Sequence, residues 1–188
     1  MIYIIVGPSH AGKTSFTVNS FIHNQDCTYY KDIVGVTECD TCYLIGNYCV
    51  DKRAKGSDTV ARQEVKFIGE QIKKLVEKND KDIILEGDKI CSRPLLDFIE
   101  MLNTKCKLYL ITCSLENSLK RNEAFNSTVS TSVLKRVKTK SENIYQLYYD
   151  KFDGEYIITD SITDFTKFSK DNFFVVSGHR FMPMNQLF

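Results

Sequence analysis

The chain opens with the apolar run "IYIIV", residues 2–6, and continues directly into "GPSHAGKT", residues 7–14. A short, uninterrupted apolar run that is rich in β-branched residues predicts a strand buried on both faces. The residues after it match G-x-x-x-x-G-K-[ST], a pattern found where a glycine-rich turn joins such a strand to a helix. The next stretch, "KTSFTVNSFIHN", can form that helix. This opening therefore predicts an α/β fold built around the first strand.

The glycine-rich turn has a specific chemistry, because its backbone amides point inward and hold phosphate oxygens. We expect the Lys13 ammonium to reach the β- and γ-phosphates of a nucleotide and the Thr14 hydroxyl to hold Mg²⁺. The predicted cofactor is ATP with Mg²⁺, although no pattern in the chain distinguishes adenine from guanine. His10 occupies a variable position of the pattern, where an incidental side chain is the simpler interpretation. The predicted cofactor-binding residues are Gly7, Ser9, His10, Ala11, Gly12, Lys13, Thr14 and Ser15.

Length and composition predict one ordinary globular domain over residues 1–188, with 43% hydrophobic residues and a formal net charge of +1. So small a charge gives no general attraction to nucleic acid or to an anionic membrane. No basic leader precedes the first apolar run, and no apolar run approaches the ~18 residues of a membrane span. We therefore expect a cytoplasmic protein without a membrane partner. Nothing in the sequence indicates an oligomeric state.

The seven cysteines are expected to be thiols, because an odd number in a cytoplasmic protein argues against a disulfide framework. A structural zinc site is the alternative for the four that lie close together in sequence. Their irregular spacing favours reduced thiols over a metal site. These four residues are Cys27, Cys39, Cys42 and Cys49.

Alternating strand and helix patterns continue along the chain and predict a mostly parallel, five-stranded sheet with helices on both faces, in a three-layer α/β/α fold. Residues 32–58 are less regular, with a turn at 45–47 between two short strands. Apolar runs predict the other core strands at 27–31, 82–88, 106–113 and 155–160, and an edge strand within 171–188. Helical patterns predict helices at 60–80, capped by Thr59, at 93–103, with Pro94 in the first turn, at 114–125 and at 141–152.

The strand "DIILEGD", residues 82–88, ends in two carboxylates, Glu86 and Asp88. A carboxylate at this place can bind a metal ion beside the phosphates or take a proton from an acceptor group. We therefore predict Lys13, Glu86 and Asp88 as catalytic residues, and Thr14 and Glu86 as metal ligands. An ordinary acidic turn at the end of a strand is the alternative interpretation.

Residues 120–140 carry six basic side chains and one acidic side chain, a net charge of +5 (6 − 1). A basic segment of this kind can close over phosphates, exclude water and stabilise charge in a transition state. We predict a basic lid over approximately residues 120–141, and a solvated helix face is the alternative. The charged residues are Lys120, Arg121, Glu123, Lys135, Arg136, Lys138 and Lys140.

The segment "DKRAKGSDT", residues 51–59, is predicted to recognise the acceptor, within an inserted region of approximately residues 32–59. Arg53 can pair with a phosphate, and Asp58 can accept hydrogen bonds from a base or a sugar. Arg62 and Arg93 are further predicted substrate-binding residues. The alternative is that Asp58 or Thr59 only caps the following helix. Two aromatic residues are candidates for stacking on a base or, more commonly, for core packing: Tyr43 and Tyr48.

The order of these features, from the first strand and GPSHAGKT through the inserted region and "LEGD" to the basic segment, resembles the nucleoside monophosphate kinase group of P-loop kinases. Two stretches, "GNYCVDKRAKGSDTVAR" and "RVKTKSENI", are similar to small phage-type P-loop kinases, which include deoxynucleotide kinases and kinases of hydroxymethylated pyrimidines in DNA. The resemblance implies a fold of the P-loop NTPase type and Glu86 as the acidic residue that ends the third strand. It also implies that Arg121 and Arg136 are lid arginines that grip the transferring phosphoryl group. The ATP cradle that it implies is Gly7, Gly12, Lys13 and Thr14.

The chain also departs from the pattern of that group. The Asp-Gly-x-Pro-Arg segment of adenylate and guanylate kinases reads Glu86-Gly87-Asp88 here, with Arg93-Pro94 later in the chain. The Asp-Arg pair of thymidylate kinases is missing, so the identity of the acceptor does not carry over. No N-K-x-D segment that reads guanine occurs, which disfavours a GTPase switch.

Together these features predict a P-loop kinase, a phosphotransferase that moves the γ-phosphoryl group of ATP to a nucleotide similar to a deoxynucleoside monophosphate. One alternative is a kinase that phosphorylates 5-hydroxymethyluracil or a similar modified base in DNA, with DNA as the polymeric substrate. An alternative of another class is a nucleotide-binding regulatory protein without transfer activity. The presence of Lys13, Thr14 and Glu86 argues against this last alternative.

Overall fold

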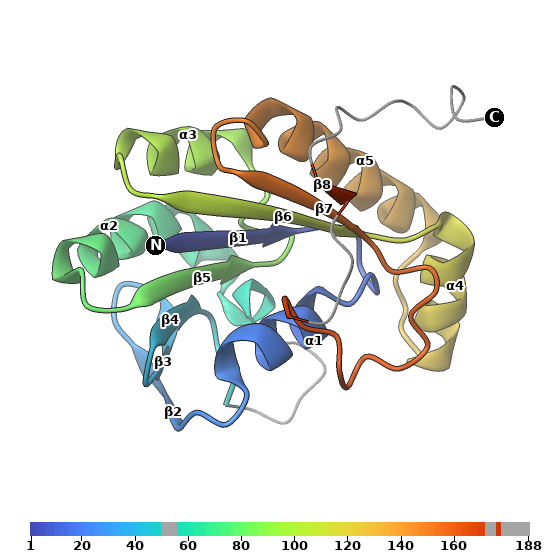
Figure 1. Cartoon of the computed structure of the whole chain (residues 1–188), viewed down its shortest axis with the longest axis horizontal. Helices are drawn as coiled ribbons and strands as arrows, with labels where there is room; N and C mark the ends of the chain where they lie inside the picture. The colour runs from blue at the N-terminus through green and yellow to red at the C-terminus, as the bar shows by residue number, and fades with distance from the viewer. Residues whose placement is uncertain (50–55, 172–175, 178–188) are drawn as a thin grey trace.

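The computed structural model describes residues 1–49, 56–171 and 176–177, which form one eight-stranded sheet with helices on both faces (Figure 1). The strand order is β2-β3-β4-β5-β1-β6-β7-β8. The strands are β1 (Ile2–Val6), β2 (Cys27–Lys31), β3 (Gly35–Cys39), β4 (Cys42–Ile45), β5 (Asp82–Glu86), β6 (Cys106–Thr112), β7 (Gly154–Ile158) and β8 (Val176–Ser177). The helices are α1 (Lys13–Thr17), α2 (Ile68–Lys78), α3 (Arg93–Met101), α4 (Leu115–Ala124) and α5 (Thr131–Tyr148).

The five middle strands, in the order β4-β5-β1-β6-β7, pair in parallel, whereas β2, β3 and β8 pair antiparallel at the two edges. The predicted α/β class and mostly parallel sheet are therefore confirmed. The prediction of five strands is wrong, because the described residues form eight. Sequence reasoning missed β3, "GVTEC", because glycine, threonine and glutamate interrupt the apolar pattern by which buried strands are found.

The turn after β4 leads to a different structure from the one predicted. No second strand follows it within the described residues, and Asn47 instead forms an isolated antiparallel bridge with Gly56. The next prediction, a helix over 60–80 capped by Thr59, is confirmed for Ile68–Lys78, but its start and its cap are wrong. Short 3₁₀ turns occupy 57–59 and 62–67, and α2 begins only at Ile68. The Thr59 hydroxyl is used differently: it accepts a hydrogen bond from the Asn47 N–H at 2.7 Å and donates one to the Gly56 carbonyl at 2.7 Å.

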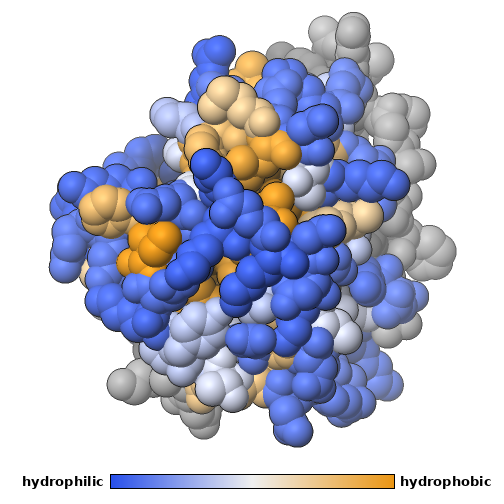
Figure 2. All heavy atoms as spheres, turned by 90° about the vertical axis from the view of Figure 1, so that its left-hand side faces the viewer, coloured by the Kyte–Doolittle hydropathy of each residue, from blue (hydrophilic) through white to orange (hydrophobic). Residues whose placement is uncertain are grey.

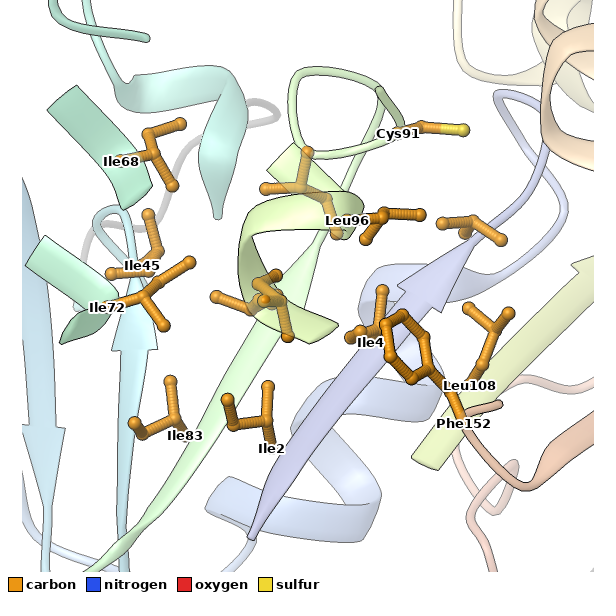
Figure 3. Packing of buried hydrophobic residues seen from close by; sticks show 14 of the residues in the cluster. Ile2, Ile4, Ile45, Ile68, Ile72, Ile83, Cys91, Leu96, Leu108 and Phe152 are labelled. Carbon is orange, nitrogen blue, oxygen red and sulfur yellow. The ribbon is translucent and has the colours of Figure 1, made fainter. Parts of the chain in front are cut away.

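Alternate residues of β1 point to opposite faces of the sheet and enter separate hydrophobic clusters. Ile2 and Ile4 lie in the cluster that includes residues of α2, α3 and α5 (Figure 3). Ile5 lies in the other cluster, together with Phe16 of α1 and Phe21 of the π-helical turn that follows it. Helices therefore cover both faces, as the three-layer prediction requires.

The chain leaves β1 toward one edge of the sheet and later continues on the other side of β1, and α1 and α5, which belong to these two parts, lie on opposite faces. From β1 the chain passes along the α1 face toward β4, whereas the connections after β5 and β6 carry α3 and α5 on the opposite face. In open α/β sheets, ligands bind outside the carboxyl ends of the strands where such a reversal occurs. The glycine-rich turn after Val6 stands at that place.

The predicted lid region, 120–141, contains the end of α4, a loop at 125–130 and the first part of α5. Ser114 caps α4, since its hydroxyl accepts a hydrogen bond from the Asn117 N–H at 3.2 Å. Ser130 caps α5 through the Val133 N–H at 3.4 Å. Most of the region is thus regular helix, and its function as a lid stays a prediction.

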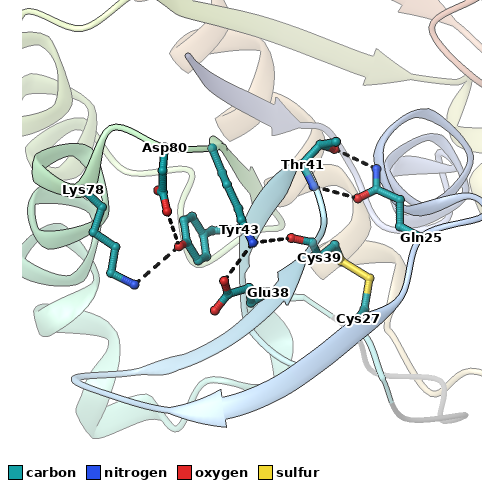
Figure 4. Close-up of polar contacts among 9 residues, drawn as sticks. Gln25, Cys27, Glu38, Cys39, Thr41, Tyr43, Lys78 and Asp80 are labelled. Atoms are coloured by element: carbon teal, nitrogen blue, oxygen red, sulfur yellow. Dashed lines mark hydrogen bonds and ion pairs between the residues drawn. A yellow bond between two sulfur atoms is a disulfide. The ribbon is translucent and has the colours of Figure 1, made fainter.

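A disulfide between Cys27 and Cys39 joins β2 to β3, so the expectation of seven free thiols is wrong for this pair (Figure 4). The two sulfur atoms are bonded to each other, and no group of three or more His, Cys, Asp or Glu side chains able to hold a metal occurs in the described part of the chain. The suggested zinc site is therefore not formed there.

Figure 4 also shows Tyr43 beside polar partners: its hydroxyl donates a hydrogen bond to Asp80 at 3.1 Å and accepts one from Lys78 at 3.4 Å. Its ring is buried, so Tyr43 does not present a stacking surface.

The face at the amino ends of the strands lies away from the glycine-rich turn. Figure 2 shows it as mostly hydrophilic, with some hydrophobic residues gathered between hydrophilic ones. Within the described ranges, none of the helices combines the length and the apolar character that a membrane crossing requires.

The burial of a strand side chain predicts how much its replacement by alanine lowers the free energy of unfolding. Ile4→Ala is expected to lower the free energy of unfolding by about 2–5 kcal/mol, because Ile4 is fully buried between two strands and a helical layer. The matched control is Ile158→Ala on β7, where the side chain is 50% exposed and the expected change is within about 0.5 kcal/mol. Urea denaturation of both variants measures the difference, and equal losses would contradict the assigned core.

Candidate active site

A cleft with a volume of about 710 Å³ lies beside the glycine-rich turn, at the carboxyl ends of β1 and β5. Residues from separate parts of the chain line it, and many of them belong to the predicted site. The lining residues are Ser9, His10, Gly12, Lys13, Thr14, Ser15, Asp58, Glu86, Arg121, Phe125, Asn126, Ser127, Thr128, Val129 and Phe165. The fold thus brings the predicted phosphate loop, one predicted carboxylate and one predicted acceptor residue into a single cleft.

Gly12 gives the turn its shape at the point where α1 begins. Its φ of 95° lies in the left-handed region, and a Cβ there would stand 2.3 Å from the Phe165 ring. Neither the backbone nor the available space allows another residue without strain. Gly12 caps α1 without a side-chain hydrogen bond, and the first N–H groups of a helix have no acceptor one turn earlier. The amides of the first turn of α1 are therefore donors directed toward the cleft end of the helix.

Lys13 and Thr14 follow Gly12 on that first turn and make different contacts. The Lys13 ammonium donates to the Pro8 carbonyl at 2.8 Å, so it folds back along its own loop. The Thr14 hydroxyl donates to Oε1 of Glu86 at 3.1 Å. The structure therefore brings together the two residues predicted as metal ligands.

Glu86 is the most deeply buried carboxylate of the site, with 4% of its surface exposed. Its second oxygen, Oε2, accepts a hydrogen bond from the Tyr48 hydroxyl at 2.6 Å. Burial raises the pKa of Glu86, while the Lys13 charge and the hydrogen bonds from Tyr48 and Thr14 act in the opposite direction. Sequence reasoning missed this hydrogen bond of Tyr48, which it considered for stacking on a base or, more commonly, for core packing, and core packing is what the structure shows. The Tyr48 ring is buried, so stacking on a base is excluded.

Asp58 is exposed and lines the same cleft as Lys13 and Glu86. Its segment is fixed by Lys89, whose ammonium donates to the carbonyls of Asp58 at 3.0 Å and Val60 at 2.6 Å. The other predicted acceptor residues are not part of the cleft lining. Arg62 and Arg93 are exposed elsewhere, the latter beside Asp97 at 3.6 Å, and Arg53 lies outside the described residues.

Asp88 and Arg136, both predicted as catalytic, do not line the cleft either. Asp88 forms an ion pair with Lys140 of α5 at 2.8 Å, and the same ammonium also donates to the Asp88 carbonyl at 3.0 Å. Arg136 is exposed on α5 and lines a separate, open hollow of about 640 Å³ with Lys135 and Lys140. Of the two carboxylates that end β5, Glu86 is the one that faces the cleft.

Arg121 does line the cleft, but its guanidinium is already engaged by the protein. It donates to the His10 carbonyl at 3.2 Å, to the Thr159 carbonyl at 2.6 Å and to the Ile162 carbonyl at 3.2 Å. It also lies over the Phe165 ring, 4.7 Å from the centroid. Arg121 therefore ties the glycine-rich turn to the loop after β7.

The wall formed by residues 125–129 and Phe165 was missed by sequence reasoning. Phe125 is 60% exposed and stacks on the His10 ring, with 6.0 Å between centroids. Burial lowers the pKa of His10. Exposed aromatic residues in irregular loops follow no periodic pattern, so only the fold reveals that they share the cleft with Lys13.

No protein-family model matches the chain, and a search of curated proteins finds no significantly similar sequence.

Because Glu86 is buried, we predict that the difference in stability between Glu86→Gln and the wild type grows with pH. An acid whose pKa is raised on folding stabilises the folded state below its ordinary pKa, and this contribution is lost as pH rises through the raised value. Glu86→Gln retains hydrogen-bonding atoms but carries no charge, so its melting temperature is expected to exceed the wild-type value by roughly a few degrees at neutral pH. The difference should vanish at acidic pH, where Glu86 is protonated.

Thermal melts across this pH range measure the effect, with Glu70→Gln as control because Glu70 is exposed on α2. A Glu86→Gln melting temperature that stays below the wild-type value at every pH would show that the buried charge does not destabilise the fold.

Proposed function

We propose that the chain is a phosphotransferase of the P-loop type that moves the γ-phosphoryl group of ATP to a nucleotide acceptor. The observation that carries this proposal is the single cleft in which Lys13, Thr14 and Glu86 lie beside Asp58. The motif also has the context that it requires, since β1 precedes the turn and α1 follows it. The proposal rests on the chemistry of these residues, because no relative supplies a function.

The residues present fit Mg²⁺ and a nucleotide triphosphate. Oxygen atoms are the ligands that Mg²⁺ prefers, and the Thr14 hydroxyl stands 3.1 Å from a carboxylate oxygen of Glu86. The first-turn amides of α1 and the Lys13 ammonium are donors suited to phosphate oxygens. Bound Mg²⁺·ATP would supply the phosphoryl group and neutralise the charge that develops on it.

The residues of the cleft would position the phosphates of bound ATP. Lys13 would exchange the Pro8 carbonyl for a phosphate oxygen of bound ATP, while Arg121 holds the turn through the His10 carbonyl. Glu86 would orient a metal-bound water and, where the acceptor is a hydroxyl as in a hydroxymethylated base, would take its proton. A role for Arg121 and Arg136 in gripping the transferring group stays a prediction, since the first is bonded to carbonyls and the second lies outside the cleft lining.

The acceptor is assigned to the Asp58 side of the cleft. Asp58 is an exposed carboxylate on a segment that backbone and lysine contacts hold in place, so it can accept hydrogen bonds from a base or a sugar. Residues 125–129 and Phe165 also line the cleft, and they would limit the access of water, which would otherwise hydrolyse ATP.

One observation favours the second candidate, a kinase of a modified base in DNA. Lys135 and Arg136 are exposed on α5 beside Lys140, and together they make the open hollow basic. Unpaired cations on a helix face can follow a phosphate backbone, and such binding weakens steeply with salt. Charge removal at Lys135 and Arg136 would then weaken DNA phosphorylation more than phosphorylation of a free nucleotide.

The test is transfer from [γ-³²P]ATP with Mg²⁺ to a panel of deoxynucleotides, nucleosides, and DNA with and without 5-hydroxymethyluracil. Label on a free nucleotide supports the first candidate, and label on the polymer supports the second. Label released only as inorganic phosphate would contradict both and favour a regulatory nucleotide-binding protein.

Lys13→Ala is expected to lower kcat/KM by about 10²–10³-fold, because a cationic donor on the transferring phosphates is lost. The matched control is Lys105→Ala, since Lys105 is exposed in the turn before β6 and its hydrogen bond with Ile2 of β1 uses the backbone carbonyl, which the substitution keeps. Initial rates of label transfer measure both variants. Unchanged activity of Lys13→Ala would exclude the catalytic proposals.

A further inference from the structure

Tyr48 is buried next to the cleft, where its hydroxyl contacts the Glu86 carboxylate. It follows β4 and the turn at Gly46, its ring is buried at 8% exposure, and it is not among the residues that line the cleft. Its hydroxyl donates to Oε2 of Glu86 at 2.6 Å, the shorter of the two hydrogen bonds that this carboxylate receives from side chains. Tyr48 therefore reaches the site only through Glu86.

Each of the two carboxylate oxygens of Glu86 accepts a hydrogen bond from a different side chain. Oε2 is taken by Tyr48, and Oε1 accepts from the Thr14 hydroxyl at 3.1 Å. The Tyr48 bond fixes the rotation of the carboxylate plane, and with Oε2 directed at the core, Oε1 is directed at Thr14 and the phosphate loop. Without that bond the carboxylate of a five-atom side chain has free rotation about its last torsion, which is broad and roughly two-fold.

The donor is itself held firmly. The Tyr48 N–H donates to the Thr37 hydroxyl at 3.0 Å, and that hydroxyl donates to the Gly46 carbonyl at 2.8 Å. Gly56 crosses directly over the pair: a Cβ there would lie 2.4 Å from the Tyr48 hydroxyl and 2.9 Å from Oε2 of Glu86. A buried ring, an anchored backbone and a covering segment leave the hydroxyl one orientation.

We propose that Tyr48 is a positioning residue that aims the Glu86 carboxylate at Thr14, so that these two side chains offer a preorganised oxygen pair to a divalent cation held with a nucleotide. This inference rests on the proposed function for the identity of the bound group, but it concerns binding rather than transfer. Partners that orient a metal-binding side chain from behind typically change metal affinity by about 10–100-fold when they are removed.

Two other roles for Tyr48 are excluded by its surroundings. Its ring has no exposed face on which a base could stack. It is not itself a metal ligand, because burial and the adjoining Glu86 charge raise the pKa of the phenol well above its ordinary value, so it stays a neutral donor. The remaining alternative is that the hydroxyl only stabilises the fold, and a double-variant cycle separates that case.

The experiment measures Mn²⁺ by electron paramagnetic resonance, as a substitute for Mg²⁺, with ADP as the nucleotide. Tyr48→Phe keeps the buried ring and removes the hydroxyl, and Tyr109→Phe is the matched control, since Tyr109 is buried in the same cluster on β6. We expect Tyr48→Phe to weaken Mn²⁺ binding in the presence of ADP about tenfold or more, and to leave ADP binding in EDTA unchanged. Tyr109→Phe should leave both affinities at the wild-type value.

The decisive comparison uses Glu86→Gln as background. If Tyr48 acts only through Glu86, adding Tyr48→Phe to Glu86→Gln produces no further loss of Mn²⁺ affinity. An equal loss in both backgrounds, or an equal loss with Tyr109→Phe, overturns the inference, and so does the absence of metal-dependent ADP binding by the wild type. Metal binding that follows the expected pattern without phosphoryl transfer to any acceptor would sustain the inference and reject the proposed function.

Discussion

The structure of the site depends on how the Glu86 carboxylate is compensated inside the protein. A charged group with 4% exposure loses most of its contact with water, which is unfavourable unless hydrogen bonds and a nearby charge replace it. Here Tyr48 and Thr14 each donate to one of its oxygens, and the Lys13 charge lies close enough to favour the ionised form. These partners come from the turn after β4 and from the first turn of α1. The carboxylate thus joins two regions that are distant in sequence.

The same compensation shapes the segment predicted to recognise the acceptor. Gly56 has a φ of 61° and passes so close to the Tyr48–Glu86 pair that no side chain fits between them. Asp58 follows two residues later and reaches the cleft because the backbone has already turned over the pair. Lys89, three residues after Glu86, holds the far side of this segment through two carbonyls. The proposed acceptor residue Asp58 and the proposed metal ligand Glu86 are therefore positioned by contacts that depend on one another.

Sequence reasoning succeeded where the signal is local. A strand, a glycine-rich turn and a helix follow one another within residues 2–17, and β5 and β6 each contain a short continuous apolar run, at residues 83–85 and 108–111. It failed where a contact between distant residues decides the conformation. The Thr59 hydroxyl binds the Asn47 N–H, which replaces the expected helix cap and delays α2 to Ile68. The pairing of Tyr48 with Glu86 spans 38 residues, and that of Arg121 with His10 spans 111, so neither leaves a pattern in a short window of sequence.

The basic residues of the site show why motif positions alone do not give roles. Lys13 is bonded to the Pro8 carbonyl, Arg121 to three carbonyls, and Lys140 to Asp88. A phosphate that binds Lys13 exchanges one neutral acceptor for a charged one, and hydrogen bonds between charged partners are the stronger kind. Moving Arg121 would instead break three hydrogen bonds to the backbone and weaken the connection between the loop after β7 and the glycine-rich turn, which the Thr159 hydroxyl also bridges through the Ala11 carbonyl. The energetic difference favours Lys13 as the residue that meets the ligand and Arg121 as the residue that keeps the cleft in shape.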